Sequence, residues 1–141
     1  AVGSISIGWI PSRSGGDLSM LKGTVTIGGY PPVGIYLPET TEEMEKGYDA
    51  LPLVSLSGML FVFGEERILP VIRRRDALDI LWIDNKVISA VCSLHAGVIA
   101  SRGTAFLEMP LGYASKHEVG IGSEVEWHLD EKETASRVVV L

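Results

Sequence analysis

The sequence has few side-chain amides, one cysteine and no long apolar run. Asn85 is the single asparagine, glutamine is absent, and Cys92 is the single cysteine. One cysteine excludes a disulfide within the chain. No apolar run approaches the roughly 18 residues that a membrane-spanning helix needs, so we predict no membrane span. Depletion of thermolabile amides is typical of proteins from hot environments, and we therefore expect a thermophilic source.

Recognised catalytic and metal-binding motifs are also missing. The three histidines, at positions 95, 117 and 128, lack the spacing of a metal site. The Gly-x-Ser-x-Gly motif of many serine hydrolases is absent. Cys92 alternates with Ile88, Ala90 and Leu94 on an apolar face, which predicts a core thiol rather than a nucleophile. We predict no metal, no cofactor and no catalytic residue, and we favour a protein that is not an enzyme.

The charge balance limits the possible partners. The chain has 141 residues and a formal net charge of -6. Nucleic acids are polyanions, so we expect no nucleic-acid partner. The length and the 46% hydrophobic content predict one globular domain over residues 1–141.

The arrangement of short apolar segments predicts a mainly β protein. Gly28-Gly29 and Asp84-Asn85-Lys86 are typical of hairpin turns, and Gly64-Glu65-Glu66 predicts a further turn. Thr40 and Glu43 have the spacing of a capping box, which predicts a short helix that starts near Thr41. A second helical turn is expected over residues 111–117. We predict a sandwich or small barrel of about eight to nine short strands with two short helices, the strands lying at residues 2–10, 24–27, 33–37, 59–63, 67–72, 78–83, 87–94, 104–109 and 124–129.

Four segments in this order resemble an uncharacterised family, the one known as domain of unknown function 192. The matching residues are Glu39-Thr40-Thr41-Glu42-Glu43 with Gly47, then Gly58-Met59-Leu60-Phe61-Val62-Phe63, then Leu78-Asp79-Ile80 with Trp82-Ile83-Asp84, and finally Leu107-Glu108-Met109-Pro110 with Gly112 and Gly122. The resemblance covers about residues 24–129. It implies a mainly β, sandwich-like fold in a family whose members are often exported. It implies no activity.

The resemblance ends at the residues that precede Leu78. Family members usually have aromatic residues there, whereas this chain has Arg73-Arg74-Arg75-Asp76-Ala77. Residues 1–22 and the last dozen residues extend beyond the core of the family. The resemblance alone implies export, so we expect a secreted or cell-surface protein. A cytoplasmic location is the alternative.

Asp79, Glu108 and Arg75 form the first candidate site. An acidic residue inside an apolar strand is costly unless it is paired. Two carboxylates beside an arginine could bind a small ligand or perform acid–base chemistry. The alternative is a buried carboxylate that an arginine neutralises and that only organises the strands.

The arginine triplet is the second candidate. Arg73 and Arg75 would share one face of a strand, where they could bind an anion through charge-assisted hydrogen bonds. A charged sheet edge that prevents aggregation is the alternative. Trp82 could form a wall of a pocket shared with these residues.

The terminal segments form the third candidate. Residues 2–10 alternate, with Ile5, Ile7 and Trp9 on one face, and a further strand expected at residues 136–141 contains Val138 and Val140. Strands of this kind add readily to exposed sheet edges. They either extend the sheet of their own subunit or pair with another copy, which would give a homo-oligomer or a filament.

Three functions follow from these candidates. The leading hypothesis is a non-catalytic interaction or assembly module that uses Ile5, Ile7, Trp9, Val138 and Val140. The second is a domain that binds a small anion or a sugar in a pocket near Asp79, Arg75 and Glu108, with Arg73 and Trp82 nearby. The third is a hydrolase that depends on the two carboxylates.

Overall fold

Seven strands form one strongly curved sheet in the part of the chain that the structure describes. The computed structural model describes residues 20–50, 58–73 and 76–130. The strand order is β5-β4-β6-β3-β2-β1-β7, and every neighbouring pair is antiparallel except β2 and β3. The elements are β1 (Leu21–Ile27), β2 (Val33–Leu37), α1 (Thr41–Lys46), the 3-10 helix η1 (Gly47–Ala50), β3 (Gly58–Arg73), β4 (Leu78–Asp84), β5 (Val87–Leu94), β6 (Gly97–Pro110), α2 (Tyr113–Lys116) and β7 (Val125–Leu129).

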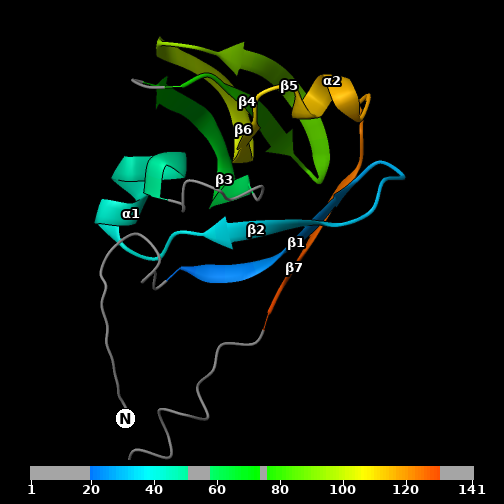
Figure 1. Cartoon of the computed structure of the whole chain (residues 1–141), viewed down its shortest axis with the longest axis horizontal. Coiled ribbons are helices and arrows are strands. Elements are labelled where there is room, and N and C mark those ends of the chain that lie inside the picture. Colours follow the sequence, from blue (N-terminus) through cyan, green and yellow to red (C-terminus); the bar gives the residue numbers. More distant parts are fainter. Residues whose placement is uncertain (1–19, 51–57, 74–75, 131–141) are drawn as a thin grey trace, which may run out of the picture.

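The sheet curls until its two edge strands approach each other without closing. One isolated bridge joins Val87, at the start of β5, to Glu124, just before β7. The backbone N–H of Val125 donates to the carbonyl of Lys86 at 2.8 Å. The prediction of a mainly β fold with two short helices is therefore confirmed, and the sheet is an incomplete barrel. Figure 1 shows α1 and α2 at opposite ends of this sheet. No helix among residues 20–50, 58–73 and 76–130 is long and apolar enough to cross a membrane.

Several local predictions are confirmed in detail. Thr40 caps α1, since its hydroxyl accepts from the backbone N–H of Glu43 while the Glu43 carboxylate accepts from the N–H of Thr40, both at 3.1 Å. Gly47 ends α1 at a positive φ of 60°. Asn85 and Lys86 adopt positive φ values of 55° and 65° in the turn between β4 and β5, as a tight hairpin of twisted strands requires.

One predicted turn is wrong. Gly64-Glu65-Glu66 does not separate two strands, because β3 continues from Gly58 to Arg73. The register with β6 shifts between Val62 and Arg67 instead, so that extra residues of β3 bulge out opposite β6. Extra residues on one strand increase its bend and twist. The same glycine and charged residues therefore produce a bend within one long strand.

Both faces of the central strands are buried. One core cluster includes Leu60, Leu81 and Leu107, and the other includes Met59, Trp82 and Phe106. Residues 78–83 of β4 are buried throughout, as a continuous apolar run predicts. Cys92 is half-buried and packs against the second cluster.

Candidate functional site

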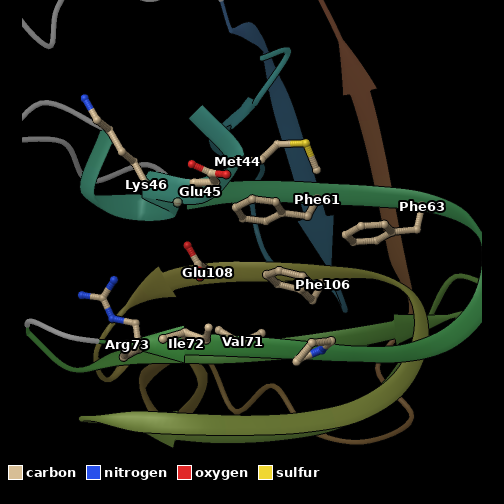
Figure 2. Close-up of a pocket in the computed structure, with 12 residues that line it drawn as sticks. Met44, Glu45, Lys46, Phe61, Phe63, Val71, Ile72, Arg73, Phe106 and Glu108 are labelled. Carbon is tan, nitrogen blue, oxygen red and sulfur yellow. The ribbon is translucent and has the colours of Figure 1, made fainter. Parts of the chain in front are cut away.

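A pocket of about 480 Å³ lies where β3 and β6 bend beside α1. Two separate parts of β3 line it, because the strand curves back past its own first half (Figure 2). Its lining residues are Met44, Glu45, Lys46, Gly47, Phe61, Phe63, Pro70, Val71, Ile72, Arg73, Phe106 and Glu108.

The curvature of β3 is held by a hydrogen bond from the core. The indole Nε1–H of Trp82 donates to the carbonyl of Leu69 at 3.0 Å, and Trp82 is only 1% exposed. Leu69 is buried beneath the pocket and Val71 lines it, and both belong to the same core cluster as Trp82. The second half of β3 is therefore fixed over the first, and the pocket is largely preformed by packing.

Phenylalanine side chains make the apolar part of the pocket. Phe61 and Phe106 are register partners on β3 and β6, and their rings stack with centroids 4.5 Å apart. Phe63 follows two residues after Phe61 and therefore shares its face, with its ring centroid 6.0 Å from that of Phe106. Figure 2 shows Phe63 at one end of the pocket, with Glu108 and Arg73 near the other.

Glu108 is the buried acid of the pocket. Its side chain is 4% exposed, and its Oε1 accepts the backbone N–H of Tyr48 at 2.8 Å. No described residue donates to its Oε2. Burial raises the pKa of Glu108 to about 7, and the charge of Asp49 adds to the increase. The hydrogen bond from the Tyr48 N–H and the charge of Arg73 lower the pKa, but burial outweighs them. Glu108 therefore gains and loses its proton near neutral pH.

Arg73 is the buried base of the pocket. It is 4% exposed, its Nη1 lies 3.3 Å from Oδ1 of Asp49, and its Nε donates to the carbonyl of Asp76 at 3.1 Å. Its Nη2 donates to the same carbonyl. A guanidinium has five N–H groups, so two of them have no acceptor among the described residues. Arg73 and Glu108 form no direct ion pair in this part of the chain.

The end of α1 positions Glu108. The carboxylate approaches the turn from α1 to η1, and a Cβ at Gly47 would lie 3.1 Å from Oε1. The positive φ of Gly47 aims the N–H of Tyr48 at the carboxylate. Burial raises the pKa of the Tyr48 hydroxyl, an effect that Arg73 opposes and Glu108 reinforces.

Asp79 does not belong to this pocket. Ile80 is the register partner of Glu108, so Glu108 shares a face with Ile80, and Asp79 points to the opposite face of β4. Its Oδ1 accepts from the hydroxyl of Ser93 at 2.7 Å, and its Oδ2 accepts from the backbone N–H of Ala114 at 2.9 Å. Asp79 thus fastens α2 and β5 to β4. The predicted grouping of Asp79 with Glu108 is not formed, because adjacent positions of a strand alternate between its faces.

The remaining predicted residues have different outcomes. Arg73 lines the same pocket as Glu108, whereas Arg75 lies outside the described residues. Trp82 does not line the pocket, because its ring is buried beneath β3. The predicted assembly residues, Ile5, Ile7, Trp9, Val138 and Val140, also lie outside the described residues.

Gly47, Asp49 and the phenylalanines belong to the site but were not predicted as site residues. One signal was available, because Phe61 and Phe63 on one strand and Phe106 and Glu108 on another are spaced by two residues and each pair shares a face. Asp49 carries no such signal, since its role depends on a contact 24 residues away in sequence with Arg73.

The arrangement can bind a ligand that combines an apolar surface with polar groups. Glu108 offers a hydrogen-bond acceptor, Arg73 offers donors, and the phenylalanines offer contact area. Among the described residues, no group of three or more histidine, cysteine or acidic side chains could hold a metal ion.

Two solved structures share this fold. One, described provisionally as a transcription regulator from Sinorhizobium meliloti 1021, has a TM-score of 0.69 and 22% identity, with 79% of this chain and 97% of the other covered. The other is a protein of unknown function from Novosphingobium aromaticivorans DSM 12444, with a TM-score of 0.61, 18% identity and coverage of 84% and 100%.

At these identities the likeness concerns the fold alone. No curated protein matches the sequence. The family model of domain of unknown function 192, described as "Uncharacterized ACR", matches residues 24–127, and these include the four segments that carry the resemblance. The chain belongs to this family.

Proposed function

We propose that this domain binds a small organic ligand in the pocket between α1, β3 and β6, without catalysing a reaction. The main support is that a buried acid, Glu108, and a buried base, Arg73, line the same pocket. They do not contact each other directly. Buried polar groups are normally hydrogen-bonded. A ligand that enters the pocket supplies the missing partners.

The size and lining of the pocket support this proposal. Ligand pockets commonly measure about 300–1,000 Å³ and combine an apolar wall with a few convergent polar groups. The pocket of about 480 Å³ has this character, with phenylalanines along its length and charged groups near one end. Both ligand classes expected from the sequence, a small anion and a sugar, are small enough for it.

The arrangement of the two carboxylates argues against the hypothesis of a carboxylate-dependent hydrolase. That hypothesis needs Asp79 and Glu108 on the same substrate, yet they point to opposite faces of the sheet. Both oxygens of Asp79 are engaged by Ser93 and Ala114. We therefore favour binding over catalysis.

The test is a ligand screen by thermal unfolding of the full chain. Sugars, organic acids, amines and nucleosides are added singly, and a ligand at about 100 times its Kd should stabilise the protein by about 2.7 kcal/mol. Met44→Trp fills the mouth of the pocket from α1, where Met44 is 44% exposed, and should abolish the stabilisation.

Two control variants make the screen specific. Leu111→Trp adds the same bulk at an exposed position outside the pocket and should leave the stabilisation unchanged. Asp79→Asn should also retain it, because Asp79 lies on the other face. No stabilisation by any compound class, or equal stabilisation in Met44→Trp, would contradict the proposal.

Self-assembly is the second candidate function, and an exposed apolar surface favours it. Ile68 and Ile72 of β3 and Val98 of β6 are 61%, 52% and 64% exposed. Ile72 and Val98 are register partners, and Ile68 lies on the same face. Exposed apolar residues that adjoin one another often mark interaction sites.

Light scattering separates the two candidate functions. If the terminal strands pair between subunits, the full chain should form oligomers that Ile7→Asp with Trp9→Asp disrupts. Ile68→Asp with Val98→Asp tests the exposed surface of β3 and β6 in the same way, because neither residue lines the pocket. A monomer at every concentration would remove the assembly function and leave ligand binding.

A further inference from the structure

We propose that the ligand is a neutral carbohydrate whose hydroxyl groups bridge Glu108 and Arg73 while an apolar face of the sugar lies against the phenylalanine wall. This inference rests on the proposed ligand-binding function and identifies the class of its ligand. The choice of a neutral ligand follows from the charges of the residues that line the pocket.

An anionic ligand meets unfavourable charges at the buried end of the pocket. It would have to approach Arg73, whose charge Asp49 already compensates at 3.3 Å. Glu108 faces the same space. An anion would therefore bring a third negative group close to Asp49 and Glu108, and like charges that meet across an interface disfavour binding strongly.

A cationic ligand meets the opposite difficulty. It would pair with Glu108, but the guanidinium of Arg73 lies in the same pocket and cannot lose its proton. The two remaining ionisable lining residues, Glu45 and Lys46, carry opposite formal charges and favour neither sign. Each ionic class thus gains one favourable contact and one unfavourable contact.

A neutral hydroxyl group satisfies both side chains at once. It donates to Oε2 of Glu108 and accepts from a free N–H of Arg73, since a hydroxyl has one donor and two acceptor lone pairs. No described residue occupies either position. Two neighbouring hydroxyls on a sugar ring can make the same bonds separately, which suits two side chains that do not touch.

The apolar wall supports a sugar ring over a simple alcohol. The C–H face of a pyranose is apolar, and Phe61, Phe106 and Val71 supply an apolar surface beside Glu108 and Arg73 (Figure 2). A ring that lies on this surface places its hydroxyl edge toward the charged end. A short alcohol would reach the charged pair but leave the wall uncovered.

The raised pKa of Glu108 is compatible with a hydroxyl partner. Because burial raises the pKa of Glu108 to about 7, both forms of the carboxyl are present near neutral pH. The ionised form accepts a charge-assisted hydrogen bond from a sugar hydroxyl. In the protonated form Oε2 carries the proton, because Oε1 accepts from the Tyr48 N–H, and it donates to the oxygen of a sugar hydroxyl instead.

The experiment compares sugars that differ only in charge at carbon 6. Glucose, galactose and mannose are each measured by isothermal titration calorimetry beside their 6-amino-6-deoxy and uronate counterparts, with the full chain at pH 7.5. At least one neutral hexose should bind at least about tenfold more tightly than both of its charged counterparts, a ratio that corresponds to about 1.4 kcal/mol.

A matched variant tests the reason for this preference. Glu108→Gln keeps an oxygen for the Tyr48 N–H but removes the negative charge. Because its amide NH2 donates where Oε2 of Glu108 accepts, it should weaken binding of the neutral hexose, and because the negative charge is gone it should reduce the preference for the hexose over its uronate at least about tenfold. Glu124→Gln removes the same charge at an exposed position outside this pocket and should change neither affinity.

The outcomes separate the two proposals. A uronate or amino sugar that binds as tightly as the neutral hexose would overturn the carbohydrate inference while leaving the ligand-binding function in place. Stabilisation in the wider screen by an amine, acid or nucleoside, with no binding of any hexose, would do the same. No binding by any compound of either set would overturn both.

Discussion

Replacing Glu108 with glutamine should make the protein more stable at neutral pH and less sensitive to pH. The folded protein holds a proton on Glu108 up to a pKa of about 7, because burial disfavours the charged carboxylate. The unfolded chain releases that proton near the ordinary glutamate pKa of about 4.3. Glutamine is always neutral and has nearly the same shape.

The sign follows from the number of protons bound in each state. Between about pH 4.3 and pH 7 the folded state binds more protons at this site than the unfolded state, so stability falls as the pH rises. The fall is complete above the folded pKa of about 7 and absent below the unfolded one. A difference of about 2.7 pH units, at about 1.4 kcal/mol for each unit, corresponds to roughly 4 kcal/mol.

Urea unfolding followed by tryptophan fluorescence measures this difference. Trp82 is buried and Trp127 is half-buried, so both report on unfolding. The stability of Glu108→Gln relative to the original protein should increase by up to about 4 kcal/mol between pH 4 and pH 8. The hydrogen bond from Tyr48 is retained by the amide oxygen in both conditions.

Glu124→Gln is the control for the loss of a negative charge. Glu124 is exposed, and surface substitutions usually change stability by less than about 0.5 kcal/mol. If Glu108→Gln followed the same pH dependence as the original protein, Glu108 would not titrate in a buried site.

Three further substitutions test the contacts that position the site. Asp79→Ala removes the acceptor for Ser93 and for the N–H of Ala114, and should cost about 2–4 kcal/mol of stability and reduce hydrogen-exchange protection in α2; unchanged protection of α2 would be contrary to this role. Trp82→Phe removes the hydrogen bond to the carbonyl of Leu69 and should cost about 1–3 kcal/mol in urea unfolding, with no cost if the bond is unimportant. Gly47→Ala places a Cβ 3.1 Å from Oε1 of Glu108 at a φ of 60°, and should cost about 1–3 kcal/mol and weaken ligand binding in calorimetry. Gly120→Ala, where a Cβ meets nothing within 4 Å and φ is not positive, is its control and should change neither.

The short-range features of the fold were the most predictable from sequence. The capping box at Thr40, the stop at Gly47 and the turn at Asn85-Lys86 depend on residues within a few positions of one another. The chemistry of each residue type decides such features locally. They were therefore confirmed together with the mainly β class.

The bend of β3 could not be predicted in the same way. Glycine followed by two glutamates is a reasonable turn by composition, and nothing nearby indicates that the strand continues. The continuation depends on pairing with residues 97–103 of β6, which lie about 30 positions away. Register between distant strands is set by tertiary packing, so the bulge and the pocket beside it were not foreseen.

The two buried carboxylates show why the candidate site was only partly predicted. Asp79 and Glu108 both interrupt apolar strands, and the sequence gives no reason to separate them. Strand register places them on opposite faces, and hydrogen bonds then distinguish their roles. Both oxygens of Asp79 are bonded within the protein, whereas one oxygen of Glu108 faces a pocket without a described partner.

This difference in hydrogen bonding is what identifies Glu108 as the functional candidate. A buried carboxylate whose bonds are complete is already stabilised and gains nothing from a ligand, which fits the structural role of Asp79 at α2. A buried carboxylate with an open position gains a bond whenever a hydroxyl donor enters, and the same burial that raises its pKa strengthens that bond in the low-dielectric interior. Burial alone, which the two residues share at 2% and 4% exposure, does not distinguish a site from a structural ion. What distinguishes Glu108 is that its Oε2 faces the pocket without a described hydrogen-bond donor.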